Sequence, residues 1–420
     1  MAGRRRGQRS KNKLKTASRS DIPSGPTTVH QIPDHLLELV LLRVGSSVAL
    51  VRAAFTCKRW LRLVADTSFL ARFRSLHAAH VAGHYHVVDR PYREKLPPDG
   101  NNQVFVPDPT AADAIDRRHF SLDFLPECDG SSSWELADSR GSLLLFYMAR
   151  TDWTGQLRFP DLVVCEPLSR RYQGIAYPPA MRRHLCFGAF LLDGSAVDET
   201  GGCNGMSNFR VIVAVYEYVA HARAAPRACV FSSGADGGWS LGQRAAGSGG
   251  VPLSWFGLIN FVGRTRWSLY WTMERDGVVL SLDESTLEFS LVMFPDAVVG
   301  WRDELSTFWV IGGEDGAVRV VRMINRDLTV FAQLQGSGEW VTEKVVRLRP
   351  ADIVAANERY ILLTPRGETC LFSVELDTLQ TESTHERNRY AGAAYPYELP
   401  WPPVLQACCA ADDRRRRRCR

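Results

Sequence analysis

The spacing of apolar positions changes along this chain, from a helical period near the N-terminus to strand-like runs later. Between residues 29 and 77, apolar residues recur every three or four positions, which is typical of amphipathic helices. From residue 121 to residue 406, short β-branched and aromatic runs alternate with turn residues, which is typical of strands. The pattern predicts an α+β multidomain protein, with a small all-α domain followed by a large all-β domain.

The first predicted helix, within QIPDHLLELVLLRVGSS at residues 31–47, has more apolar residues than one buried face requires. Pro33 suits the first helical position, and Asp34 suits the positive end of the helix dipole. Five apolar residues follow helical spacing: Leu36, Leu37, Val40, Leu41 and Val44. Leu39 and Leu42 lie off that face. The helix is either an ordinary core helix or one whose second face binds another protein.

Further helical periodicity follows through SVALVRAAFTCKRWLRLVAD and SFLARFRSL, with Thr67 as a predicted N-cap of the last helix. Three or four short helices thus occupy about 48 residues, close to the lower size limit for a core that folds alone. A partner that covers the remaining apolar face would stabilise such a unit.

The segment resembles the F-box family. The family's Leu-Pro start corresponds to Ile32 and Pro33, its paired leucines to Leu36-Leu37, and its Ile-Leu pair to Val40-Leu41. Its Val-Cys-Lys-x-Trp signature corresponds to TCKRW at 56–60, with Thr in place of Val. The resemblance implies a three-helix F-box that binds a Skp-type adaptor and, through it, a cullin–RING ubiquitin ligase. A generic helical hairpin with a buried Trp is the alternative.

The resemblance also indicates which side chains would contact the adaptor. Some of them would instead belong to the internal core, and the sequence does not divide the two groups. The predicted adaptor-binding residues are Ile32, Pro33, Leu36, Leu37, Val40, Leu41, Leu50, Cys57 and Trp60.

Five hairpins recur in the strand region, each with two β-rich runs and a short polar turn. Their turns are predicted near Pro167, Gly234, 283–285, 325–327 and 377–378. Spacings of about 40 to 70 residues and roughly 286 residues in total predict a propeller of about six blades. The runs DSRGSLLLFY, LVVCEPLSRRY and LYWTMERDGVVLSLDESTLEFSLVMFP resemble the F-box-associated β-propellers of plant-type F-box proteins. A large β-sandwich or barrel is the alternative.

Charge is concentrated at the two ends. Residues 1–20 have eight Lys or Arg and no acid, and residues 414–420 have six Arg. Without these fourteen, 37 basic residues face 46 acidic ones over residues 21–413, a net charge of about −9. Because phosphate binding needs clustered positive charge, nucleic acid is an unlikely partner of the body. The basic ends are expected to be solvated arms or nuclear import signals.

The ten cysteines form no C-x-x-C pair and have no His at zinc-finger spacing, so free thiols in a reducing compartment are expected. No secretory signal or membrane span is predicted, although the basic leader also resembles a transit peptide. These features favour the nucleus or the cytoplasm.

Catalytic motifs are missing from the sequence: there is no G-x-S-x-G elbow, P-loop or dinucleotide fingerprint. His84 and His86 are a weak pair of metal ligands, and we expect no cofactor and no metal. The dense tryptophans Trp255, Trp267, Trp271, Trp301, Trp309 and Trp340 are expected to pack between blades, or in one or two cases to hold a target on an open face.

The domains expected are a basic tail at 1–28, an F-box at 29–77, a linker with possible first strands at 78–120, a propeller at 121–406 and an Arg-rich tail at 407–420. The expected function is the non-catalytic substrate receptor of a Skp–cullin–F-box ubiquitin ligase, with the propeller binding the protein marked for proteasomal degradation. The alternatives are an interaction scaffold outside ubiquitination that uses the propeller alone, and a nucleic-acid-associated regulator that uses the Arg tails.

Overall fold

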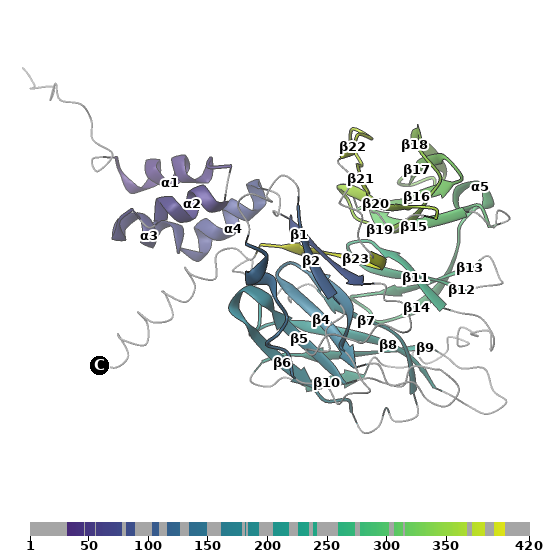
Figure 1. Ribbon diagram of the computed structural model, residues 1–420, viewed down its shortest axis with the longest axis horizontal. Coiled ribbons are helices and arrows are strands. Elements are labelled where there is room, and N and C mark those ends of the chain that lie inside the picture. The colour runs from purple at the N-terminus through teal and green to yellow at the C-terminus, as the bar shows by residue number, and fades with distance from the viewer. Residues whose placement is uncertain are drawn as a thin grey trace, which may run out of the picture.

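The computed structural model divides into a helical unit and a β domain (Figure 1). The structure describes residues 32–45, 47–54, 56–77, 81–88, 103–108, 116–126, 134–148, 161–178, 181, 184–192, 205–217, 226–234, 238–241, 259–273, 278–301, 306–313, 316–367, 372–382 and 390–399. The expected basic tails at 1–28 and 407–420 lie outside these residues.

The helical unit consists, within the described residues, of α1 (Asp34–Leu42), α2 (Ser47–Ala54), α3 (Lys58–Val64) and α4 (Thr67–Leu76). It has four helices where the resemblance implies three. Its core contains Leu37, Leu50, Val64, Phe69 and Phe73, contributed by all four helices. The N-cap of α4 is Asp66, not Thr67 as expected, because the Asp66 carboxylate accepts the backbone N–H groups of Ser68 and Phe69.

The strands of the β domain pair antiparallel, apart from the parallel pair of the first strands of two successive groups at Gly263–Val310, and mostly follow chain order. One sheet has the order β2-β1-β23, with β1 (Val81–Val88), β2 (Gln103–Pro107) and β23 (Tyr390–Glu398). The next contains β3 (Trp134–Arg140), β4 (Leu143–Met148), β5 (Leu162–Glu166) and β6 (Arg171–Ile175). The third contains β7 (His184–Leu192), β8 (Arg210–Glu217), β9 (Pro226–Ser232) and β10 (Gly238–Leu241).

The remaining sheets come from the second half of the chain. An eight-stranded sheet joins β11 (Ile259–Arg264), β12 (Ser268–Met273), β13 (Val278–Asp283) and β14 (Phe289–Met293) to β15 (Ser306–Gly312), β16 (Val318–Ile324), β17 (Asp327–Gln333) and β18 (Trp340–Arg347). The last contains β19 (Ala351–Ala356), β20 (Tyr360–Pro365), β21 (Phe372–Glu375) and β22 (Thr381–Glu382). The short helices are η3 (Arg117–Phe120), η4 (Pro167–Ser169) and α5 (Asp296–Val299).

All five predicted hairpins are confirmed by strand pairing. They are β5 with β6, β9 with β10, β13 with β14, β16 with β17, and β21 with β22. Non-Gly residues adopt a left-handed backbone in several of these turns, namely Arg170, Leu287, Asn325 and Leu379. Local turn chemistry therefore sets the hairpins, as the sequence indicates.

The core of the β domain lies between successive sheets. One cluster joins β4 and β5 to β7, β8 and β9. Another joins β7, β8 and β9 to β12 and β13, with Trp271 fully buried at its centre. A sheet that no helix covers must bury its faces against its neighbours, and the stacked sheets satisfy this requirement.

The first strand of each four-stranded group contacts the first strand of the next. β3 contacts β7, β7 contacts β11, β11 contacts β15 and β15 contacts β19. The sequence of contacts then returns to its start, because β23 contacts both β19 and β3. A large β domain whose sheets follow one another around a ring is propeller-like.

The ring is closed by the two ends of the β domain. β23 pairs antiparallel with β1, with Tyr85 opposite Tyr395, and β1 pairs with β2. The runs at 134–148 lie outside this closing sheet, because β3 and β4 form their own sheet with β5 and β6. The segment 78–120 supplies β1 and β2 to this closing sheet.

Candidate functional site

Helix α1 has two apolar faces. The inner face holds Leu37, Leu41 and Leu42, which are 1–3% exposed and pack in the helical core. The outer face holds Leu36, Leu39 and Val40, which are 45, 49 and 58% exposed. In an α-helix, residues three and four apart lie on the same side, so these three side chains form one exposed stripe. We call Leu36, Leu39 and Val40 the outer stripe of α1.

The outer stripe is costly to leave in water. Burial of a Leu or Val side chain is worth roughly 1.5–3 kcal/mol, so the stripe offers several kcal/mol to any surface that covers it. The exposed residues next to the stripe are polar: His35 lies four residues before Leu39, and Arg43, just after α1, lies four residues beyond it. An apolar stripe rimmed by polar residues is the usual composition of a protein-binding surface.

Ion pairs and hydrogen bonds fix α1 in the helical unit. Arg59 of α3 pairs with Asp34 at the start of α1 and donates to the backbone oxygen of Ile32. Arg72 of α4 pairs with Glu38 at 2.6 Å. The outer stripe is therefore presented on a helix whose orientation is already set.

The C-terminal end of α1 is held as well. The Nε2 atom of His77, just beyond α4, hydrogen-bonds to the Leu42 backbone oxygen at 2.7 Å. The ring of His77 packs on Phe73 at 4.1 Å between centroids. Orphan carbonyls at the end of a helix need such partners.

The nine predicted adaptor-binding residues separate into three groups. Leu37, Leu41 and Leu50 are at most 2% exposed and belong to the core of the helical unit, which is the second of the two roles expected for members of this set. Ile32 and Trp60 are half-buried and pack against that core, Cys57 is half-buried, and only Pro33, Leu36 and Val40 of the nine are exposed. A hydrogen bond from the backbone N–H of Trp60 lowers the pKa of the Cys57 thiol.

Leu39 is the residue that sequence reasoning missed. Helical periodicity places it off the apolar face, yet it lies next to Leu36 and Val40 on the exposed side. Its spacing of three from Leu36 is a sequence signal, which is ambiguous because almost every position of this helix is apolar.

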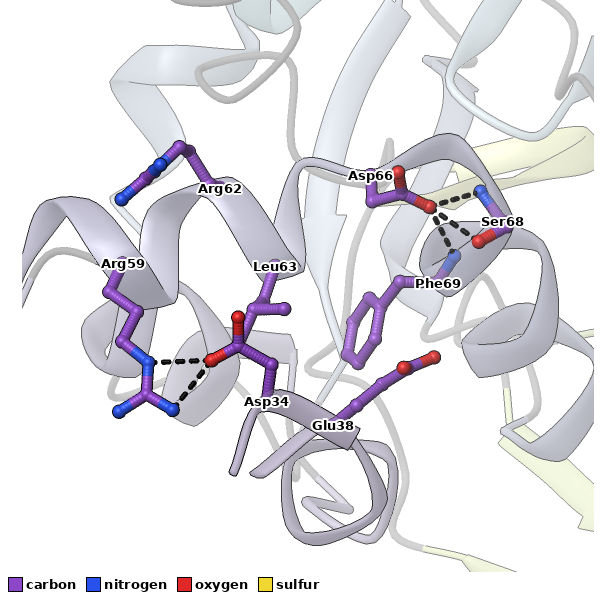
Figure 2. Close-up of a pocket in the computed structure, with 8 residues that line it drawn as sticks. All are labelled: Asp34, Glu38, Arg59, Arg62, Leu63, Asp66, Ser68 and Phe69. Atoms are coloured by element: carbon purple, nitrogen blue, oxygen red, sulfur yellow. Dashed lines mark hydrogen bonds and ion pairs between the residues drawn. The ribbon is translucent and has the colours of Figure 1, made fainter. Parts of the chain in front are cut away.

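A pocket of about 360 Å³ lies on the other side of α1, between α1 and the α3–α4 turn. Figure 2 shows its lining, with Arg59 reaching Asp34 and with Asp66 holding Ser68 and Phe69. The carboxylates that line it are engaged within the helical unit, since Glu38 pairs with Arg72 and Asp66 caps α4. The polar groups of this pocket therefore serve the packing of the helices.

At one end of the β-domain ring, an ionic network joins three successive sheets. Arg264 of β11 pairs with Asp138 of β3 at 3.1 Å and with Glu284 at 3.0 Å, and it donates to the Leu191 backbone oxygen of β7. Arg140 donates to the same oxygen at 3.1 Å. Burial raises the pKa of Asp138, and Arg264 opposes that effect. Arg140 also pairs with Glu284 at 3.6 Å, so both arginines and both carboxylates of the network have partners of opposite charge, which is typical of a structural network.

The paired histidines of β1 and the cysteines of the β domain that the structure describes, which could bind a metal or act as nucleophiles, are buried, and His84 is hydrogen-bonded within the protein. His84 hydrogen-bonds to the Tyr360 hydroxyl at 2.5 Å, and its ring lies 6.0 Å from that of His86. In the described part of the chain, no three His, Cys, Asp or Glu residues are grouped as metal ligands. Cys165, Cys186 and Cys229 are free and buried, and burial raises their thiol pKa values, to about 12 for Cys186 and about 11 for Cys229. No helix among the described residues is long and apolar enough to cross a bilayer.

No known protein-family model matches this chain, and no curated protein matches its sequence. Solved structures with some likeness include a functionally unknown protein from Desulfotomaculum acetoxidans, at 12% identity and a TM-score of 0.36, which covers 66% of this chain and 78% of that one. The β-propeller domain of Cps50 (Swd1) from Myceliophteria thermophila has 11% identity and a TM-score of 0.33, over 63% and 75% of the two chains. AztD from Citrobacter koseri has 10% identity and a TM-score of 0.31, over 72% and 71%. At these TM-scores, none of the three bears on what this chain binds.

Proposed function

We propose that this protein is the substrate receptor of a Skp–cullin–F-box ubiquitin ligase. In this proposal the helical unit is an F-box that binds a Skp-type adaptor, and the β domain is a six-bladed propeller that binds a protein target. The receptor itself catalyses nothing. It raises the effective concentration of its target near the ubiquitin-loaded enzyme, in the nucleus or the cytoplasm.

The observation behind the proposal is the outer stripe of α1. The resemblance of residues 32–70 to an F-box implies that an adaptor covers part of α1, and the exposed Leu36, Leu39 and Val40 supply an apolar surface at that place. The contact would be a helix laid against an apolar groove, with anchors at positions i, i+3 and i+4. Pro33, which is also exposed, would extend the surface by one turn toward the N-terminus.

The strand order supports the proposed count of six blades. Each of β3–β6, β7–β10, β11–β14, β15–β18 and β19–β22 is a group of four consecutive strands, and β23 with β1 and β2 supplies the sixth group. Pairing of the first and last strands is an efficient way to close a ring of sheets, because it ties the two ends of the β domain together by hydrogen bonds within one sheet.

The proposal is tested by co-purification of the tagged full-length chain from cells with the proteasome inhibited. We expect a Skp-type adaptor and a cullin to co-purify with the unmodified chain, and not with the double variant Leu36→Asp/Val40→Asp. The matched control is Met293→Asp, which changes a side chain that is 77% exposed on β14 and should leave the complex intact. Failure of the unmodified chain to bring down an adaptor would leave a scaffold that acts through the β domain alone.

A further inference from the structure

Trp267 stands apart from the other tryptophans in its exposure. Among those whose side chains the structure describes, the rest are buried or half-buried, whereas Trp267 is 55% exposed. Trp271, four residues later, is fully buried among Phe187, Phe190 and Phe261. The tryptophans of this region thus divide into residues that pack sheets together and one that meets solvent.

The turn that presents Trp267 is fixed from both sides. The backbone N–H of Thr265 donates to the Ser268 oxygen at 2.8 Å, and that of Glu284 donates to the Trp267 oxygen at 2.8 Å. Immediately before the turn, Arg264 is held by the ionic network with Asp138 and Glu284. Because the backbone of the turn is already ordered, a partner that binds there would lose little free energy in ordering it.

Arg266 supplies a charge beside the indole. Its guanidinium carbon lies 4.8 Å from the centre of the Trp267 ring, and the side chain is exposed. No ion pair to Arg266 is formed among the residues that the structure describes. Trp and Arg dominate the energetics of protein–protein contacts, because each offers a large rigid surface and directed hydrogen bonds or charge.

The turn lies on the face of the β domain from which the helical unit departs. Val81, the start of β1, pairs with Glu398 at the end of β23, and the Glu398 N–H donates to the Gly141 oxygen just after β3. Arg140, at the end of β3, and Arg264, at the end of β11, both donate to the oxygen of Leu191 near the end of β7. These strand ends therefore share one face, and the turn that follows β11 belongs to it.

We propose that Arg266 and Trp267 form a docking point for an acidic protein segment. An apolar side chain of the segment packs on the indole, and a neighbouring Asp or Glu pairs with the guanidinium. A nucleic-acid strand would need a broad positive surface for its row of phosphates, which a body with a net charge of about −9 over residues 21–413 does not offer, whereas a protein segment needs only a single carboxylate at Arg266. This inference names the chemical class of the target. It rests on one part of the proposed function, namely that the β domain binds a protein.

The inference is tested by fluorescence anisotropy on the full-length chain with labelled synthetic peptides. One set places a Leu, Phe or Trp next to Asp or Glu at varied spacings, and a second set has Lys in place of the acids. We expect members of the acidic set alone to bind, and Trp267→Ala and Arg266→Glu each to weaken binding by about tenfold or more. Arg266→Glu should in turn admit members of the Lys set, which a purely structural role of Arg266 would not produce.

Tyr172→Ala is the matched control, because Tyr172 is an exposed aromatic residue, at 48%, on a different sheet. Its binding should equal that of the unmodified chain. The inference is wrong if no acidic peptide binds, if Tyr172→Ala weakens binding as much as Trp267→Ala, or if a single-stranded oligonucleotide binds at Trp267 in place of the peptides. Because the assay contains no adaptor, its outcome is independent of whether α1 binds one.

Discussion

Leu36 and Leu37 are adjacent in α1, yet Leu36 is 45% exposed and Leu37 is 1% exposed. The first belongs to the outer stripe and the second to the core of the helical unit. A pair of identical neighbours thus has two separate roles in the proposed receptor. Leu37 therefore contributes to the stability of the helical unit, and Leu36 to its proposed binding of a partner.

The two leucines should therefore respond differently to truncation. Leu37→Ala should lower the free energy of unfolding of the helical unit by about 2–5 kcal/mol, because it leaves a cavity in the core. Leu36→Ala should change it by no more than about 0.5 kcal/mol. Urea unfolding followed by circular dichroism measures both values, and equal losses for the two variants would refute the division.

Arg264 should stabilise the β domain through its buried partners. Arg264→Ala removes the ion-pair partner of Asp138 and leaves Glu284 with Arg140 alone, and loss of one member of a buried network costs about 3–5 kcal/mol. Arg118→Ala, which removes a 90% exposed partner of Asp116, should leave the unfolding midpoint nearly unchanged, because water screens an exposed ion pair. Thermal unfolding of the two variants provides the comparison, and similar midpoints would contradict a structural role for the network.

Gly263 should tolerate no side chain. Its φ is +123°, and a Cβ atom would lie 2.1 Å from the backbone oxygen of Val310, where β11 and β15 pair in parallel. Gly263→Ala should lower the free energy of unfolding by about 3 kcal/mol through strain and overlap. Gly174→Ala is the control, because apart from its two chain neighbours no residue has an atom within 4 Å of the position that its Cβ would take. Equal free energies of unfolding for the two variants would contradict the close approach of β11 to β15 at Gly263.

The contribution of Asp66 to the free energy of unfolding of the helical unit should depend on pH. The Ser68 hydroxyl lowers the pKa of Asp66 from 3.8, so the stabilising charge is fully present above that value. It is lost as the pH falls through the lower pKa of the folded state. Asp66→Ala should cost about 1 kcal/mol at neutral pH, as expected for loss of an N-cap, and less in acid. Unfolding free energies across this range give the test, and a cost independent of pH would assign the effect to something other than the charge.

Local patterns allowed the sequence to predict much of the β domain. The five hairpins follow from β-rich runs around turns such as Asp283-Glu284-Ser285, where the Asp283 carboxylate accepts the N–H groups of Ser285 and Thr286. The partner of β1 could not be predicted in this way. β23 pairs with β1 across about 300 residues of chain, and no local pattern specifies such a distant partner.

The candidate site was predicted only as a region. Periodicity places an apolar helix between Pro33 and Gly45, and the structure has it at Asp34–Leu42 with Pro33 as its N-cap. Most residues of this short helix are Leu or Val, and the burial of each depends on where α3 and α4 pack. Arg59 and Arg72, which fix α1 through Asp34 and Glu38, are distant in sequence and gave no signal. Trp267 and Trp271 likewise share a residue type and differ only in their three-dimensional surroundings.

The most direct test of the account is the affinity of the full-length chain for a purified Skp-type adaptor, measured by isothermal titration calorimetry. We expect the unmodified chain and Met293→Asp to bind with equal affinity. Leu36→Asp/Val40→Asp should bind at least about a hundredfold more weakly, because two charges would enter an apolar interface, with its unfolding free energy unchanged. Equal binding by all three proteins, or no binding by any of them, would contradict the claim that the outer stripe of α1 is an adaptor-binding surface.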